Sequence, residues 1–180
     1  MRIIAGKLKG LVLNTFDAEN IRPTLDRARE GIFNKIQFVI SGSNVLDLFG
    51  GTGAVSLEFL SRGASNVITC DNNKNSIELI NQNFKKAKLT PILKIGDYLD
   101  TLNSLANEKF DIIFLDPPFA TDFGEKAIDK IINNNNLSQY GIIIFEHSSE
   151  KVVEYPKSIE VIDCKKYGYI AADYLRLRND

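Results

Sequence analysis

The stretch from Asn44 to Asp71 constrains the fold of this chain more than any other. A short apolar run leads into Gly-Gly-Thr-Gly at 50–53, an amphipathic segment follows, and a second apolar run ends at Asp71. The order strand, glycine turn, helix, strand and acid predicts a βαβ unit with a right-handed parallel crossover. Glycine in the turn lets the backbone pass close to a ligand, where a Cβ would intrude. The acid after the second strand is placed to bind the two hydroxyls of a ribose.

Two kinds of ligand use such a turn. The dinucleotide fingerprint is G-x-G-x-x-G with a pyrophosphate at the helix N-terminus, and here Ser56 occupies the third glycine position. Asp47, at the end of the first strand, would repel a phosphate but suits a cationic amino-acid head group. S-adenosylmethionine carries an ammonium and a sulfonium and no phosphate. The turn by itself leaves both ligands open.

A second motif, Asp-Pro-Pro-Phe at 116–119, follows the near-continuous apolar run 110–115. Such a run is typical of a central parallel strand, and open α/β sheets bind ligands beyond the carboxyl ends of their strands. The two prolines leave nearby carbonyls without local donors. A carboxylate beside a free carbonyl matches the two hydrogens of an NH₂ group, and the aromatic ring can stack on a base. Alone, Asp-Pro-Pro is more often a capped strand end; together with the glycine turn it indicates methyl transfer to an amino group, whose developing positive charge these acceptors stabilise.

The two motifs together resemble the class I S-adenosylmethionine-dependent methyltransferases with a (D/N)-P-P-(F/Y/W) motif, which modify exocyclic amines of bases. The block Arg-Pro-Thr-x-Asp-Arg-x-Arg-Glu at 22–30 and the segment before it, followed by both motifs in this order, resemble the RsmD family. The similarity covers nearly the whole chain, although residues 72–109 carry little of it. It implies methyl transfer from S-adenosylmethionine to N2 of a guanine in small-subunit ribosomal RNA. The implied partner is that RNA, free or in an assembling particle, and the implied location is cytoplasmic.

The resemblance also implies roles for individual residues, in three groups. Cofactor-binding residues are Asp47, Phe49, Gly51 and Gly53 at the methionine end, Asp71 at the ribose and Asp97 at the adenine. Catalytic residues are Asp116 and Pro117, which hold the target amine, and Phe119, which stacks on the base. Substrate-binding residues are Arg22, Thr24, Arg27 and Arg29, in a block that closes over cofactor or target.

Two of these assignments depart from the family pattern or depend on position alone. Asp71 is followed by two asparagines and not by another acid, which leaves open which side chain takes the ribose. Asp97 is assigned only from its place after the third predicted strand. An aspartate after a glycine is also common as a turn residue or a helix cap.

Strands alternating with helices, and then a closing hairpin, predict an α/β fold. We expect a doubly wound, mostly parallel, seven-stranded, Rossmann-like sheet with an antiparallel edge strand. The 180 residues suit a single domain, 1–180. Within it, residues 1–20 are predicted as an N-terminal β-hairpin extension, and a helix capped by Thr24 or Asp26 follows.

Charge is unevenly distributed along the chain, whose net charge is −1. Residues 1–35 hold seven Lys/Arg against four Asp/Glu, residues 36–163 eleven against seventeen, and residues 164–180 four against two. Basic ends on an acidic body favour a polyanionic partner held by the appended elements, although a solvated face would give the same pattern.

Composition excludes several other classes. No run of about eighteen apolar residues predicts a membrane span, and the N-terminus lacks the apolar core of a signal peptide. Cys70 and Cys164 are expected to be buried free thiols in a reducing cytosol. With His147 as the single histidine, no metal site is expected. No apolar stripe demands a partner subunit, so a monomer is expected. Neither His147 nor Glu146 is assigned to catalysis, because amine methylation needs no strong base.

Three other functions remain open from the sequence. A DNA adenine-N6 or protein glutamine-N5 methyltransferase shares the proline motif, but most such enzymes have Asn where this chain has Asp116. They also need a separate recognition region that 180 residues scarcely accommodate. A nucleotide-binding module or dehydrogenase, and an RNA-binding protein without catalysis, are the others. The two intact motifs argue against both.

Overall fold

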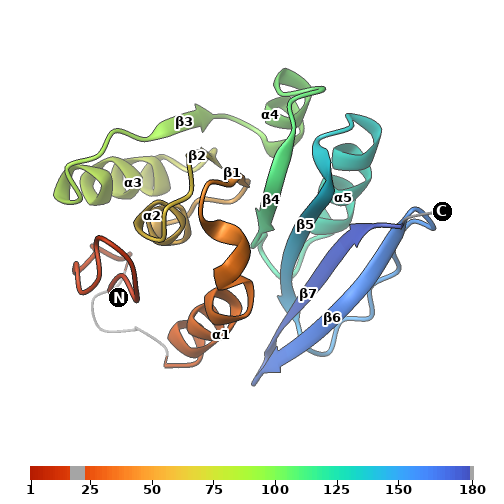
Figure 1. Cartoon of the computed structure of the whole chain (residues 1–180), viewed down its shortest axis with the longest axis horizontal. Helices are drawn as coiled ribbons and strands as arrows, with labels where there is room; N and C mark the ends of the chain where they lie inside the picture. The colour runs from red at the N-terminus through yellow and green to blue at the C-terminus, as the bar shows by residue number, and fades with distance from the viewer. Residues whose placement is uncertain (17–22, 179–180) are drawn as a thin grey trace.

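The computed structural model describes residues 1–16 and 23–178, with the side chains of residues 23–25 outside the description. Its centre is a seven-stranded sheet in the order β3-β2-β1-β4-β5-β7-β6 (Figure 1). The predicted fold class is confirmed. The elements are α1 (Pro23–Ile40), β1 (Asn44–Asp47), α2 (Ala54–Ser61), β2 (Asn66–Asp71), α3 (Lys74–Lys86), β3 (Ile92–Ile95), α4 (Tyr98–Ser104), β4 (Phe110–Leu115), α5 (Phe123–Asn133), β5 (Leu137–Ser148), β6 (Ile159–Tyr167) and β7 (Ile170–Leu177).

The parallel part of the sheet follows from its apolar runs. β1 pairs with β2 on one side and β4 on the other, and β4 pairs with β5, all in parallel. β7 runs antiparallel to both β5 and β6, so the one reversed strand lies inside the sheet, next to the edge strand β6. The carboxyl ends of β1, β2 and β4 therefore meet at one edge, where open α/β sheets bind ligands.

Helices cover both faces of the sheet. One buried cluster joins α1 and α2 to the sheet through residues such as Phe33, Phe59 and Phe114. A second joins α4 and α5 to the opposite face through residues such as Leu102, Ile113 and Ile128. Alternate residues of a strand point to opposite faces, and Ile113 and Phe114 accordingly belong to different clusters. Two packed faces make the sheet edge a rigid platform.

The N-terminal segment has a shorter hairpin than predicted. Residues 1–3 pair antiparallel with residues 11–13 through the bridge Arg2 to Val12 and two flanking backbone hydrogen bonds of 3.0 and 3.1 Å. The pairing goes no further on the first strand, where the N–H groups of Ile4 and Ala5 donate to the Glu58 carboxylate of α2 at 2.7 and 3.0 Å. Residues 17–20 of the predicted hairpin lie outside the described residues.

Two smaller expectations are settled by burial and by helix length. Cys70 is a buried free thiol, as predicted, but Cys164 is exposed, because it lies on the edge strand β6 and not in the core. Over the described part of the chain, no helix has the length and apolar character needed to cross a membrane.

Candidate active site

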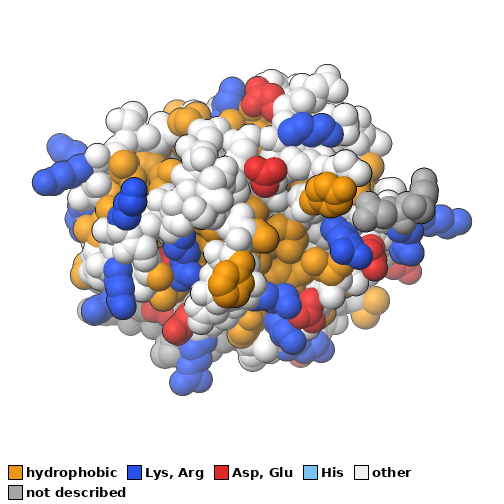
Figure 2. Space-filling model, viewed as in Figure 1, with side chains coloured by type: hydrophobic (Ala, Val, Ile, Leu, Met, Phe, Trp, Pro, Cys, Tyr) orange, Lys and Arg blue, Asp and Glu red, His pale blue; other side chains and the backbone are white. Residues whose placement is uncertain are grey.

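A pocket of about 490 Å³ lies at the carboxyl edge of the sheet, in the size range of small-molecule sites. Six residues predicted from the sequence line it: Phe49, Gly51, Asp71, Asp116, Pro117 and Phe119. In the space-filling view, hydrophobic side chains gather in the hollow near the centre of the face, and Lys and Arg side chains lie around it (Figure 2). The glycine turn and the Asp-Pro-Pro-Phe corner, some sixty-five residues apart in the chain, thus share one cavity.

The glycine turn is built so that its backbone faces the pocket. Gly51 has φ +54° and Gly53 has φ +76°, in the left-handed region that favours glycine. A Cβ built on Gly51 meets no atom within 4 Å, so it would enter the space that a ligand uses. Gly53 does not line the pocket; it precedes α2, close to Ile80. Of the two glycines predicted as cofactor residues, Gly51 therefore lines the pocket, and Gly53 forms the turn into α2.

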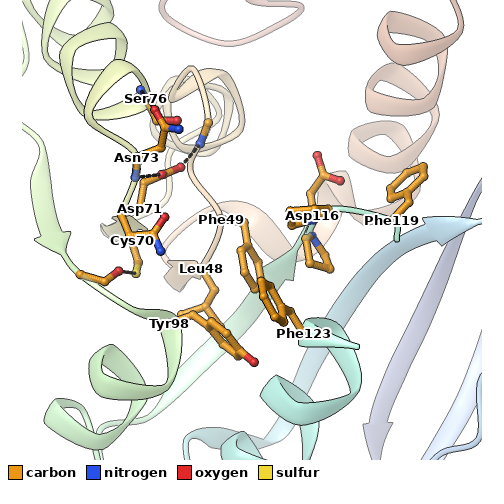
Figure 3. A pocket seen from close by; sticks show the side chains of 15 residues that line it. Leu48, Phe49, Cys70, Asp71, Asn73, Ser76, Tyr98, Asp116, Phe119 and Phe123 are labelled. Carbon is orange, nitrogen blue, oxygen red and sulfur yellow. Dashed lines mark hydrogen bonds between the residues drawn. The ribbon is translucent and has the colours of Figure 1, made fainter. Parts of the chain in front are cut away.

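Asp71 is held at the donor end of the pocket by two backbone hydrogen bonds. Its Oδ2 accepts the N–H of Gly51 and its Oδ1 that of Asn73, both at 2.8 Å (Figure 3). Each carboxylate oxygen can accept a further hydrogen bond. The side chain is therefore oriented by the backbone and keeps acceptor capacity for a ligand, and its predicted contact with a ribose stays a prediction.

Asp47 lies beneath the turn and not in the pocket lining. It is 1% exposed, and its Oδ2 accepts the Ser56 hydroxyl at 2.6 Å. No described residue bonds its buried Oδ1. Burial raises the pKa of Asp47 to about 7, against the opposing effect of the Ser56 hydroxyl. The structure thus brings this acid close to the site without placing it on the surface a ligand would meet.

Asp97 is the residue before α4, and its carboxylate accepts the N–H of Leu99 at 2.8 Å as a helix cap. Its neighbours Gly96 and Tyr98 line the pocket, but Asp97 itself does not. The predicted contact of Asp97 with adenine stays a prediction.

The acceptor end of the pocket is the corner from Asp116 to Phe119. Pro117 is buried, and no described residue donates to its carbonyl or to the Asp116 carboxylate. Asp116 is exposed to the pocket, yet the protein around it is dense enough that desolvation raises the pKa of its carboxyl to about 6. Two hydrogen-bond acceptors at this wall, the Asp116 carboxylate and the Pro117 carbonyl, therefore have no partner among the described residues.

Glu146 adds a second acid beside this corner. Leu115 pairs with Phe145 in parallel register, so the residues that follow are neighbours: Asp116 comes directly after β4, and Glu146 lies within β5. Burial, and then the negative charge of Asp116, raise the pKa of Glu146 well above its ordinary range. Glu146 does not line the pocket.

Aromatic rings are divided between the two ends of the site. Phe49, Tyr98 and Phe123 form a row, with ring centroids 5.3 and 5.1 Å apart. Phe119 lies on the other side of Asp116 from Phe49 and Phe123 (Figure 3). The Phe119 ring is thus separate from the row of three aromatic rings that lines the pocket.

The predicted substrate-binding residues on α1 are placed differently from one another. Arg27 is exposed, whereas Arg29 is 7% exposed and donates through Nη2 to the carbonyl of Arg2 at 2.8 Å. Arg22 and the side chain of Thr24 lie outside the described residues. Neither Arg27 nor Arg29 lines the pocket, so their contacts with a target stay predictions.

His147 is engaged away from the pocket. Its Nδ1 donates to the carbonyl of Ser148 at 2.9 Å, and its Nε2 lies 3.1 Å from the Asp173 carboxylate. Burial disfavours the charged imidazole, but these two partners outweigh it and raise the pKa of His147. His147 is not among the pocket residues.

Sequence reasoning missed much of the lining. The missed residues come from the ends of β1 and β2, the start of α3, and the loops before α4 and α5: Leu48, Cys70, Asn72, Asn73, Ser76, Gly96, Tyr98, Pro118 and Phe123. Two of them could have been predicted from their position, because Asn72 and Asn73 directly follow Asp71 at the end of its strand.

The residues present fit S-adenosylmethionine. Asp71 offers oriented acceptors for ribose hydroxyls, and the bare Gly51 backbone leaves room beside it. β2 and β4 are separated by β1 alone, so Asp71 and Asp116 stand about two strand spacings, or about 10 Å, apart. A donor bound at Asp71 can therefore reach the Asp116 corner.

Comparisons with known proteins agree with the geometry. The candidate rRNA methyltransferase YlbH of Bacillus subtilis is 34% identical over 174 residues, 94% of this chain and 94% of that protein. Ribosomal RNA small subunit methyltransferase D of Haemophilus influenzae is 32% identical over 176 residues, 95% of this chain and 91% of that protein. A solved structure, the candidate methyltransferase yhhF of Escherichia coli, has a TM-score of 0.86 at 27% identity and covers 100% of this chain and 99% of its own.

Fold and site together are those of an S-adenosylmethionine-dependent methyltransferase. The family model described as "Conserved hypothetical protein 95" matches residues 1–176. The chain belongs to that family.

Proposed function

We propose that this protein transfers a methyl group from S-adenosylmethionine to the exocyclic N2 of a guanine in small-subunit ribosomal RNA. One observation carries the proposal: Asp116 and Pro117, whose carboxylate and carbonyl have no described partner, line the same pocket as Asp71 and Gly51. The names of the relatives, which include small-subunit ribosomal RNA methyltransferases, supply the class of substrate.

The chemistry assigned to the corner is positioning and electrostatic stabilisation. When bound, S-adenosylmethionine supplies a methyl group activated by the sulfonium. Asp116 and the Pro117 carbonyl each accept one hydrogen of the guanine amine, which directs the nitrogen lone pair at that methyl. The nitrogen would gain its bond to the methyl carbon as the carbon–sulfur bond breaks and S-adenosylhomocysteine leaves, while the Asp116 carboxylate stabilises the positive charge on nitrogen. The methylated nitrogen would then release one proton to Asp116 or to water, so no strong base is required beforehand.

Phe119 is assigned to the base itself. Its ring is partly exposed and stands apart from the row of Phe49, Tyr98 and Phe123. A base inside a helix or loop must leave its stack to reach such a corner, and stacking on an aromatic side chain compensates part of that cost.

The RNA would be held by the positive charge near the chain ends. Arg27, Lys7 and Lys9 are exposed, and the space-filling view shows Lys and Arg side chains around the central hollow (Figure 2). Their attraction to phosphates would be independent of sequence. The proposal takes the protein as a cytoplasmic monomer that acts on RNA, free or in an assembling particle, without a metal.

The test compares acceptors directly. The full chain is incubated with methyl-labelled S-adenosylmethionine and, separately, ribosomal RNA, small-subunit particles, DNA or protein. We expect label in the RNA or the particles, as N2-methylguanine, and mass mapping of ribosomal RNA from cells lacking the protein should show one unmodified guanine. Label in adenine of DNA or in a protein glutamine would overturn the proposal in favour of the sister activities that share the proline motif.

A further inference from the structure

Asn83 joins three parts of the molecule through one buried side chain. It lies on α3, is 0% exposed and does not line the pocket. Its Nδ2 donates to the carbonyls of Thr52 at 2.8 Å and Asn14 at 3.0 Å, and its Oδ1 accepts the N–H of Asn14 at 2.7 Å. Both ends of the amide are used, on two segments that are far apart in the chain.

The first of these segments is the glycine turn. Thr52 stands between Gly51 and Gly53, both at positive φ, and Gly51 both lines the pocket and donates to Asp71. A hydrogen bond to the Thr52 carbonyl therefore holds the turn from α3. Without it, a partly buried carbonyl would lose its partner, and the turn would be free to shift.

The second segment is the N-terminal one, residues 1–14. Asn14 makes two further hydrogen bonds to α3: its Nδ2 donates to the Gln82 side chain at 2.7 Å, and the Lys86 ammonium donates to its Oδ1. Leu13 is buried against the same helix. The segment is also fixed to α2 through Glu58. It is therefore a docked unit whose end is tied to the cofactor turn.

We infer that Asn83 is a positioning residue that couples the cofactor turn to the N-terminal segment. A ligand that orders the turn would then also order residues 1–14, although no residue of that segment touches the pocket. Such coupling is reciprocal, so a well-docked segment strengthens cofactor binding by the same factor. The inference depends on donor binding in the pocket and not on the methyl acceptor. It can therefore fail or stand separately from the assignment of guanine.

The test is hydrogen exchange of the full chain with and without S-adenosylhomocysteine. In the unmodified protein we expect this ligand to slow exchange of the amides that hold the segment, among them Ile3, Gly10 and Leu13. In Asn83→Asp, which keeps the shape and one acceptor but loses both donated bonds, that slowing should vanish while slowing around Asp71 persists. The dissociation constant of the ligand should rise about tenfold, as expected for loss of the hydrogen bond to the Thr52 carbonyl, which is the one of the two that holds the turn. The kcat at saturating cofactor should change by less than about twofold, so the loss appears in KM.

Two matched variants separate this role from general stability. Asn81→Asp makes the same change at an exposed position of α3 and should behave as the unmodified protein. Gln82→Ala removes a bond to the Asn14 side chain and leaves the Thr52 bond, so cofactor affinity should hold. If S-adenosylhomocysteine slowed amide exchange in the unmodified protein only around the pocket and not in residues 1–14, the inference would be overturned without any variant. Unchanged affinity and unchanged slowing of residues 1–14 in Asn83→Asp would overturn it as well.

Discussion

The two acids that face the pocket from its opposite ends are held in different ways. At the donor end, both oxygens of Asp71 accept backbone N–H groups at 2.8 Å, from Gly51 and Asn73. At the acceptor end, no described residue donates to the carboxylate of Asp116, and desolvation by the surrounding protein raises its pKa to about 6. One carboxylate is oriented by its own βαβ unit, and the other keeps its hydrogen-bonding capacity free.

The difference separates binding from chemistry. A carboxylate that is already hydrogen-bonded adds affinity through its remaining lone pairs and changes little during a reaction. A desolvated carboxylate without partners gains most when positive charge develops beside it, and that occurs in the transition state. Substitutions at Asp71 should therefore act on cofactor affinity, and substitutions at Asp116 on rate.

The largest effect is expected from Asp116→Ala. Removing one preorganised acceptor should lower kcat by about 10²–10³, while affinity for S-adenosylhomocysteine stays within about twofold. Single-turnover methylation and calorimetry measure the two quantities. Asp129→Ala, at an exposed acid on α5, is the control. Near-normal turnover in Asp116→Ala would remove this acid from the mechanism.

Asp71→Ala should show the reverse pattern. Hydrogen bonds to a charged group contribute about 1.5–3 kcal/mol, so the cofactor should bind about 10- to 100-fold more weakly. At saturating S-adenosylmethionine, kcat should change little. Asp71→Asn, which keeps an acceptor oxygen, should lose less affinity. A fall in kcat as large as that of Asp116→Ala would break the division between the two ends.

Two phenylalanines allow a matched comparison: Phe119 in the loop after β4 and Phe123 at the start of α5. Phe119→Leu should lower kcat/KM for RNA about tenfold, because a stacked base contributes about 1–3 kcal/mol, and leave cofactor affinity unchanged. Phe123→Leu, in the row with Tyr98, should instead raise KM for the cofactor. Filter-binding and steady-state assays on both variants decide the assignment. If both variants lost only RNA activity, the row would belong to the base and not to the donor.

The smallest effect concerns pH. Asp116 carries the negative charge that stabilises the methylated nitrogen only when it is ionised, so with a pKa of about 6 the rate should be about half maximal near pH 6 and rise to a plateau above it. Because the folded pKa is above the ordinary value, the contribution of this group to stability is present below about pH 4 and is lost as pH rises through 6. Asp116→Asn should thus raise thermal stability at pH 8 more than at pH 4. A pH–rate profile and melting curves test both, and an unshifted low-pH limb in Asp116→Asn would assign the titration to another group.

Local signals predicted the parts of the site that follow strand ends. Asp71 and Asp116 were found because each comes directly after an apolar run, and Gly51 because a strand-to-helix turn needs its conformation. Tyr98 and Phe123 were missed, because each starts a helix from another part of the chain and reaches the pocket only through packing. Asp47 was expected in the lining but lies one layer below it, bonded to Ser56.

The N-terminal segment shows the same division. Its apolar and glycine pattern predicted a hairpin, and the structure limits the pairing to residues 1–3 and 11–13, because Glu58 of α2 accepts the amides of Ile4 and Ala5. Cys164 shows it as well: an apolar neighbourhood predicted burial, but its strand lies at the sheet edge. The sequence pattern indicates which residues can pair or be buried. Residues distant in the chain decide which of these contacts form.

By itself, the sequence determined the βαβ unit, the alternation of strands and helices in an α/β sheet, and the two motifs for which donor binding and amine chemistry are proposed. These depend on backbone conformation and on residues close in the chain, where steric and hydrogen-bonding rules act locally. Only the tertiary structure decided that Asp71 is held by Gly51 and Asn73, that Asp116 stands without a described partner in the same cavity, and that Asn83 ties the turn to residues 1–14. Such contacts join segments distant in sequence, and their burial, which sets both hydrogen bonding and pKa, exists only once the sheet and its helices have packed.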